Sequence, residues 1–294
     1  MRKLMLIVVL FATVAFAQQQ PDFSKVEIKV TKVAGNVYML EGMGGNIAVS
    51  AGDDGVVMVD AEYAPLADKI RAAIKTISDK PVRYLINTHW HGDHTSGNTA
   101  FGDSAVIIAH DNVRKWLGTE QKNVFGQPVP PIAKNGLPVI TYDHDPALHL
   151  NGDDILLYHP ANSHTDGDTI VYFSNEHVVH MGDNFVNGRW PILDVPHGGS
   201  VKGMIAADEL VLSHTDADAK IIPGHGPLST RADLEKYVAM LKDTRDIVAA
   251  QIQKGRTPEQ MKQDKILAKY DSLGSPDRYI DFLYADLSRS IAGK

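Results

Sequence analysis

The chain of 294 residues contains no cysteine. This absence excludes a disulfide framework, a thiol nucleophile, an iron–sulfur cluster held by thiolates and every zinc site that uses a thiolate ligand. Any metal ion bound by the protein must therefore be held by nitrogen and oxygen. The content of 44% hydrophobic and 22% charged residues is that of a folded globular chain that is long enough to bury a sizeable core.

The sequence also lacks an apolar run long enough to cross a membrane near its N-terminus. The apolar stretch 4–17 follows Arg2 and Lys3 and ends in Ala15-Phe16-Ala17, the small-x-small pattern of a cleavage site. Its 14 residues fall short of the roughly 20 that a membrane-spanning helix needs. We therefore predict a signal peptide over residues 1–17 and a periplasmic or secreted mature protein without a stable membrane anchor.

Positive charge is scarce, with 29 Lys and Arg residues against 36 Asp and Glu residues. Removal of Arg2 and Lys3 with the signal peptide takes the formal charge from −7 to −9, and no cluster of basic residues interrupts this balance. Such a surface repels phosphate backbones, which argues against nucleic acid as a partner. We expect a small-molecule substrate, and the sequence leaves the oligomeric state open.

Hydrophobic periodicity predicts two similar halves. In each half, short strands come first and a helix and a further strand follow. The first half has expected strands at 26–30, 36–40, 46–50, 55–60, 81–87 and 105–109 and helices at 64–77, 95–101 and 110–118; the second has strands at 148–150, 154–159, 168–173, 177–182 and 220–222 and a helix at 200–213. We predict two sheets packed face to face with helices outside. Residues 121–138 read as a loop between the halves and 229–291 as mostly helical, so that 18–294 form a single domain with a helical C-terminal extension.

Side chains that can bind metal gather directly after the apolar strand expected at 82–86. The sequence there is Thr88-His89-Trp90-His91-Gly92-Asp93-His94. In an extended or turning loop, residues two apart point the same way, so His89 and His91 can bind one ion while Asp93 and His94 turn toward a second. A lone histidine is usually structural, but four ligands within six residues at a strand end predict a metal site.

This HxHxDH spacing resembles the metallo-beta-lactamase fold superfamily, and the resemblance extends over essentially the whole mature chain. Three later signals occur in the expected order: His164 before a Thr-x-Gly turn, Asp183 in Gly-Asp-Asn-Phe, and His225 in Pro-Gly-His-Gly. The resemblance implies an α/β fold, a four-layer αβ/βα sandwich of two mixed sheets with outer helices. It is specific because the four signals occur together.

The resemblance implies a ligand set for two zinc ions per chain. It assigns His89, His91 and His164 to one ion, Asp93, His94 and His225 to the other, and Asp183 to both. Zinc held by three imidazoles lowers the pKa of bound water to about 7, so a metal-bound hydroxide is available at neutral pH. Asp93 would orient this nucleophile. An all-nitrogen-and-oxygen site is also more tolerant of iron or manganese than a thiolate site.

Three further residues are candidates for substrate binding. The segment 187–200 follows Asp183 and should form one wall of the site, where Arg189 could hold a substrate carboxylate and Asn187 could donate to a carbonyl group. Trp90, between the ligands, is a candidate apolar contact. Equally, Arg189 could pair with a nearby acid such as Asp194, and Trp90 could simply pack in the core.

Several activities share this ligand set. Export argues against glutathione-dependent thioester hydrolysis of the glyoxalase II type, and export with negative charge argues against nucleases. Exported class B beta-lactamases resemble this chain in length and in the Gly198-Gly199-Ser200 turn, but two of their subclasses place Cys at the position of Asp183, and the third uses no bridging Asp. Quorum-signal lactonases resemble one another in a Tyr three residues after the bridging Asp, where this chain has Val186.

We therefore predict an exported dinuclear zinc hydrolase that opens a cyclic amide or ester, with beta-lactam cleavage as the leading activity. The alternatives are a lactonase, a glyoxalase II-like thioester hydrolase, or an oxidoreductase similar to persulfide dioxygenases. The last class holds one iron on residues that match His89, His164 and Asp183. A non-enzymatic protein that uses the fold as a scaffold is a further alternative, which the intact ligand set disfavours.

Overall fold

The computed structural model describes residues 22–292, so the predicted signal peptide lies outside the described residues. The chain forms two sheets, which we call the N-terminal sheet and the C-terminal sheet. The N-terminal sheet has the order β1 (Lys29–Ala34), β2 (Val37–Glu41), β3 (Ile47–Gly52), β4 (Gly55–Val59), β5 (Val82–Ile86), β6 (Val106–His110) and β9 (Ile140–Tyr142). The C-terminal sheet has the order β10 (Ala147–Leu150), β11 (Asp153–Tyr158), β12 (Ile170–Phe173), β13 (Val178–His180), β14 (Lys220–Ile222) and β15 (Ser229–Thr230).

Both sheets are mixed. Strands β1 to β4 form an antiparallel meander, whereas β4, β5, β6 and β9 are parallel. In the C-terminal sheet β10 to β13 are antiparallel, and β13 pairs with β14 in parallel. As a consequence β11, β13 and β14 run in the same direction and end at the same edge.

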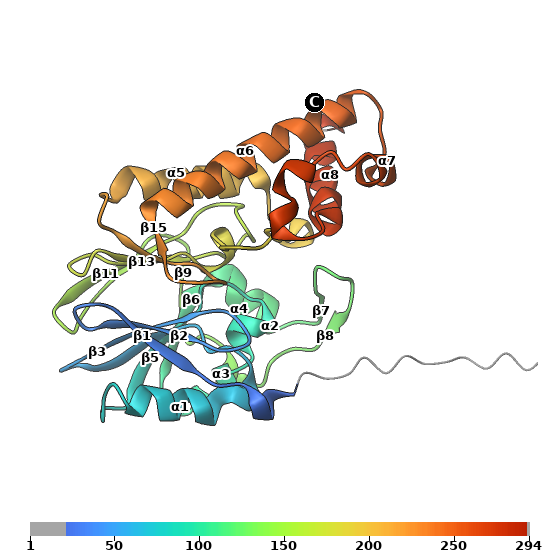
Figure 1. Ribbon diagram of the computed structural model, residues 1–294. Helices are drawn as coiled ribbons and strands as arrows, with labels where there is room; N and C mark the ends of the chain where they lie inside the picture. The colour runs from blue at the N-terminus through green and yellow to red at the C-terminus, as the bar shows by residue number, and fades with distance from the viewer. Residues whose placement is uncertain (1–21, 293–294) are drawn as a thin grey trace, which may run out of the picture.

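The helices of the described residues are α1 (Ala67–Lys75), α2 (Gly92–Thr95), α3 (Asn98–Phe101), α4 (Asp111–Leu117), α5 (Val201–His214), α6 (Arg231–Gln253), α7 (Pro258–Gln263) and α8 (Asp277–Ala292). The long helices lie on the outside, whereas the short helix α2 lies beside the strands (Figure 1). Helix α1 covers the outer face of the N-terminal sheet, and α5 and α6 cover that of the C-terminal sheet. No helix within residues 22–292 is both long and apolar enough to cross a membrane.

Three apolar clusters hold these layers together, as the alternating strand patterns require. The first lies between the sheets, where Val59 and Ile86 pack in the same cluster as Leu157 and Phe173. The second joins the N-terminal sheet to α1, and the third joins the C-terminal sheet to α5, α6 and α8. The predicted four-layer sandwich is confirmed.

The segment between the two halves differs from the expectation. Residues 121–138 contain the two-stranded hairpin β7 (Gln121–Lys122) and β8 (Pro128–Val129) and a 3-10 turn at Lys134–Gly136, rather than a plain loop. Asn123 tightens this hairpin because its side-chain oxygen accepts hydrogen bonds from the backbone N–H groups of Phe125 and Gln127. The segment is rich in turn residues but pairs with itself, which its composition did not indicate.

Candidate metal centre

All seven predicted ligands lie at one edge of the sandwich, in loops that follow strands. His89, His91, Asp93 and His94 follow β5, and the last two belong to the short helix α2. The other three ligands, His164, Asp183 and His225, follow β11, β13 and β14, whose carboxyl ends meet at the same edge. Four separate loops thus converge because their strands end together.

The first ligand group is formed by His89, His91, His164 and Asp183, all buried. The Nδ1 atom of His91 lies 3.1 Å from Nε2 of His164, and Nε2 of His164 lies 3.8 Å from Oδ2 of Asp183. The His89 ring stands nearly perpendicular to the rings of both other histidines. Three imidazoles therefore surround a common point, which suits a tetrahedral ion with one further ligand.

The second group is formed by Asp93, His94 and His225. Nε2 of His225 lies 3.2 Å from Oδ2 of Asp93 and 3.4 Å from Nε2 of His94. Oδ1 of Asp183 lies 3.2 Å from Nε2 of His94 and 3.4 Å from Nε2 of His225, so this carboxylate reaches the second group as well. Asp183 thus touches both groups, as the predicted bridging role requires.

The site fits two cations by its own chemistry. Nε2 of His89 is buried without a hydrogen-bond partner among the described residues, which is costly unless a metal ion is bound. Burial lowers the pKa of His94, but Asp183, Asp60 and Asp93 outweigh it and hold that pKa well above its usual value. In the same way, Asp183 and Asp93 raise the pKa of His225 to about 9 against the effect of burial. The carboxylates therefore favour the binding of cations at the second ligand group.

A buried carboxylate that the sequence did not single out as functional orients the first group. Oδ2 of Asp194 lies 2.9 Å from Nε2 of His91 and accepts a hydrogen bond of 3.1 Å from the indole N–H of Trp90. Nδ1 of His197 lies 2.8 Å from the other oxygen. Burial raises the pKa of Asp194, but His197 and His91 hold it well below its usual value. An ionised carboxylate accepts only, so Nε2 of His91 carries the proton and Nδ1 is left free for a metal.

A second carboxylate, Asp60, orients the second group. It is fully buried, its Oδ2 lies 2.7 Å from Nδ1 of His94, and it accepts hydrogen bonds from the backbone N–H and the hydroxyl of Thr88. Asp60 has a positive φ of 65° at the end of β4, a conformation that is uncommon for a residue other than glycine. Its place after a buried strand is a signal that sequence reasoning could have used.

The comparisons with known proteins agree with this geometry. The family profile described as "Metallo-beta-lactamase superfamily" matches residues 30–237, which include all seven ligands. The chain belongs to the metallo-beta-lactamase superfamily. Helices α7 and α8 lie beyond the matched part.

Several solved structures share this superfamily fold. A metallo-beta-lactamase from Pontibacter korlensis has a TM-score of 0.61 at 18% identity, over 74% of this chain and 99% of the other. FIM-1 from Pseudomonas aeruginosa, in its mono-zinc form, has a TM-score of 0.59 at 19% identity, over 74% and 96%. A double mutant of the sec-alkyl sulfatase PisA1 has a TM-score of 0.64 at 14% identity, over 87% of this chain and 50% of the other. At these identities the likeness concerns the fold.

A curated relative is similar in sequence. The 2,4-dinitroanisole O-demethylase subunit alpha of Nocardioides sp. (strain JS1661) is 30% identical over 162 residues, which is 53% of this chain and 46% of the relative. The chain therefore matches about half the length of this relative.

The three expected substrate contacts differ in their placement around the superfamily site. Trp90 is only 2% exposed and donates to Asp194, so it packs behind the ligands and is corrected from a substrate contact to a structural residue. Arg189 is exposed, and no ion pair to Asp194 forms, because that carboxylate is buried among other donors. Asn187 donates from its side chain to Ser229, and its backbone N–H donates to the carbonyl of His225. It therefore fixes the last ligand loop.

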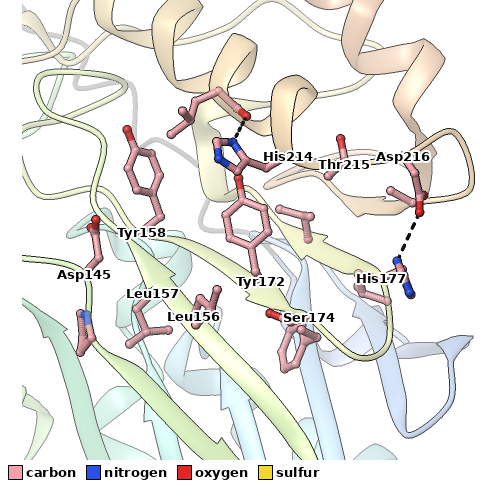
Figure 2. Close-up of a pocket in the computed structure, with 16 residues that line it drawn as sticks. Asp145, Leu156, Leu157, Tyr158, Tyr172, Ser174, His177, His214, Thr215 and Asp216 are labelled. Atoms are coloured by element: carbon pink, nitrogen blue, oxygen red, sulfur yellow. Dashed lines mark hydrogen bonds and ion pairs between the residues drawn. The ribbon is translucent and has the colours of Figure 1, made fainter.

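A separate cavity of about 540 Å³ lies on the outer face of the C-terminal sheet (Figure 2). Leu156, Tyr158 and Tyr172 project into it from β11 and β12, and His214 closes it from the end of α5. None of the seven ligands lines this cavity. The metal-ligand cluster, and not this cavity, is therefore the candidate site of chemistry.

Proposed function

We propose that this member of the superfamily is an exported dinuclear zinc hydrolase that opens a cyclic amide or ester, with beta-lactams as the first substrates to test. The observation that carries the proposal is the pair of ligand groups joined through Asp183. Bound zinc ions would supply a Lewis acid and lower the pKa of the attacking water. This ligand chemistry supports hydrolysis without a protein nucleophile.

The residues of the chain have separable tasks in such a reaction. The carboxylate of Asp93 is the most exposed of the seven ligands, with 28% of its side chain accessible, so it can accept a hydrogen bond from water at the mouth of the site. Burial raises the pKa of Asp93, but His94 and His225 keep it well below its usual value. The carboxylate is therefore ionised at neutral pH and suited to orient the nucleophile.

Metal content and a substrate panel test the proposal. Elemental analysis of the purified protein should find two zinc ions per chain, and one iron per chain would instead favour the oxidoreductase alternative. The panel should contain nitrocefin, a penicillin, a carbapenem, a lactone and a thioester. It should also contain 2,4-dinitroanisole, because the curated relative is named for that compound.

The Asp93→Asn variant connects the site to any activity found. We expect at least a hundredfold loss of kcat together with weaker binding of one metal ion, since the variant loses both the acceptor that orients the nucleophile and a carboxylate of the second ligand group. Asp154→Asn, which alters an exposed carboxylate beside His149, is the matched control and should keep full activity. Zinc-loaded protein that hydrolyses no cyclic amide or ester would refute the proposed reaction.

A further inference from the structure

A second cavity, of about 360 Å³, lies between the β7–β8 hairpin and helix α8. Its wall is mostly apolar and aromatic, being formed by Phe125, Trp190, Pro191, Ile192, Tyr279 and Phe282. Figure 1 shows the hairpin and α8 on the same side of the molecule. They meet where the guanidinium carbon of Arg278 lies 4.7 Å from the centre of the Phe125 ring.

The floor of this cavity is attached to the metal centre. The backbone carbonyl of Ile192 lies 2.8 Å from Nδ1 of His164, whose other nitrogen faces the first ligand group. Helix α8 holds the same loop, because Arg289 donates to the carbonyl of Val195. A group seated on Ile192 would thus lie directly behind a metal ligand.

The hairpin side of the cavity is attached to the same ligand group. Gln121, at the base of the hairpin, places Oε1 3.1 Å from Nε2 of His197. His197 in turn contacts Asp194, which contacts His91. Both walls therefore keep a fixed position relative to the three histidines, as a substrate subsite requires.

The lining indicates the kind of group that fits. The rings of Trp190 and Tyr279 stack with their centres 5.0 Å apart, and the indole N–H of Trp190 is already used by the carbonyl of Gly274. The two charged residues, Asp277 and Arg278, are exposed and opposite in sign, so they give no net preference for an ion. An uncharged flat ring therefore suits this cavity best.

The wall contributed by α8 lies outside the part of the chain that matches the superfamily profile, which ends at residue 237. Ser275, Asp277, Arg278, Tyr279 and Phe282 all belong to this C-terminal extension. Without it the cavity would lose one side. The extension therefore adds a binding surface to a metal centre that the superfamily supplies.

We propose that this cavity binds an uncharged aromatic ring in the non-reacting part of the substrate. As a specificity subsite it rests on the proposed hydrolase function, but ring binding is measurable without turnover. Burial of a phenyl ring gives on the order of a tenfold to hundredfold preference over a methyl group. The preference should depend on the space beside α8.

Binding is tested by calorimetric titration of the purified full-length protein with N-benzylacetamide and, as the small reference, N-methylacetamide. We expect only the benzyl compound to bind. Ser275→Trp places a large side chain on the lining and should weaken its binding at least tenfold. Ser272→Trp, an equally exposed position outside the lining, is the matched control and should leave binding unchanged. Equal binding of N-benzylacetamide to Ser275→Trp and Ser272→Trp would overturn the proposal.

Activity gives a second, independent readout. Two substrates that share one reactive ring, one with a benzyl and one with a methyl side chain, are compared by their kcat/KM values. The wild-type protein should favour the benzyl compound. Ser275→Trp should reduce this benzyl-to-methyl preference, and Ser272→Trp should not. Ring binding without hydrolysis of any substrate would refute the proposed function and leave the subsite in place. Hydrolysis with no benzyl preference and no binding of N-benzylacetamide would refute the subsite alone.

Discussion

Asp194 offers the sharpest test of how the metal centre is built. Three donors converge on its carboxylate, namely the ring N–H of His91, the indole N–H of Trp90 and the ring N–H of His197, at 2.8–3.1 Å. The Asp194→Asn variant keeps the shape of the side chain but has one oxygen with two lone pairs. It can satisfy at most two of these donors, and its amide group faces the third.

The size of the effect follows from this count. A buried donor left without a partner costs about 1–3 kcal/mol of folding free energy. The ring of His91 also loses the contact that places its proton on Nε2, so its Nδ1 is no longer held toward His164. Loss of such an outer contact lowers metal affinity about 10–100-fold, which corresponds to roughly 1.4–2.7 kcal/mol.

Zinc titration against a competing chelator measures the affinity, and urea unfolding of the metal-free protein measures the stability. In Asp194→Asn we expect the affinity for one of the two zinc ions to fall, and the free energy of unfolding of the metal-free protein to fall as well. Asp154→Asn removes a comparable His–Asp contact of 2.6 Å at an exposed site and should change neither quantity, since exposed pairs contribute little. Wild-type affinity and stability in Asp194→Asn would refute the assigned role of Asp194.

Three further predictions follow from buried groups. Asp60→Asn should weaken binding of the other ion about 10–100-fold in the same titration, because His94 loses the side-chain oxygen of Asp60 that lies 2.7 Å from its Nδ1 and orients its ring; unchanged binding would contradict this. Gly224→Ala should impair binding of both ions, since a Cβ there would overlap the Asp183 carboxylate, and two tight sites in the titration would exclude that overlap. Asp208 is fully buried, neither of its oxygens has a hydrogen-bond partner among the described residues, and burial followed by Glu209 raises its pKa well above the usual value. The folded state therefore keeps the Asp208 carboxyl protonated, whereas the unfolded state releases that proton above about pH 4, so the free energy of unfolding falls as pH rises. Asp208→Asn removes this group and should add little stability at pH 4.5 and more at pH 8, as measured by urea unfolding. A stability gain that does not vary with pH would contradict this.

Sequence periodicity anticipated much of the fold because several strands and helices, such as β11 and α1, bury one face and expose the other. The expected helices at 64–77 and 200–213 correspond to α1, with the 3-10 turn before it, and to α5. The expected helix at 95–101 is divided between α2 and α3, and the hairpin at 121–129 was missed. Both differences concern short segments, whose structure depends on tertiary contacts more than on their own pattern.

The seven candidate ligands could be named from the sequence because each lies in a short motif next to a strand, and these motifs together resemble those of the superfamily. The residues that surround these ligands could not be named from the sequence. Asp194 contacts His91 and Trp90 across 103 and 104 positions of the chain, and only the packing of α8 and the 190–201 loop against the sheet edge brings them together. The sequence by itself determined which side chains can hold the metals. The tertiary structure decided which carboxylates orient these ligands, that Trp90 is buried while Arg189 is exposed, and that the C-terminal helix forms a cavity beside the site. Each of these features depends on contacts between segments that are distant in the chain.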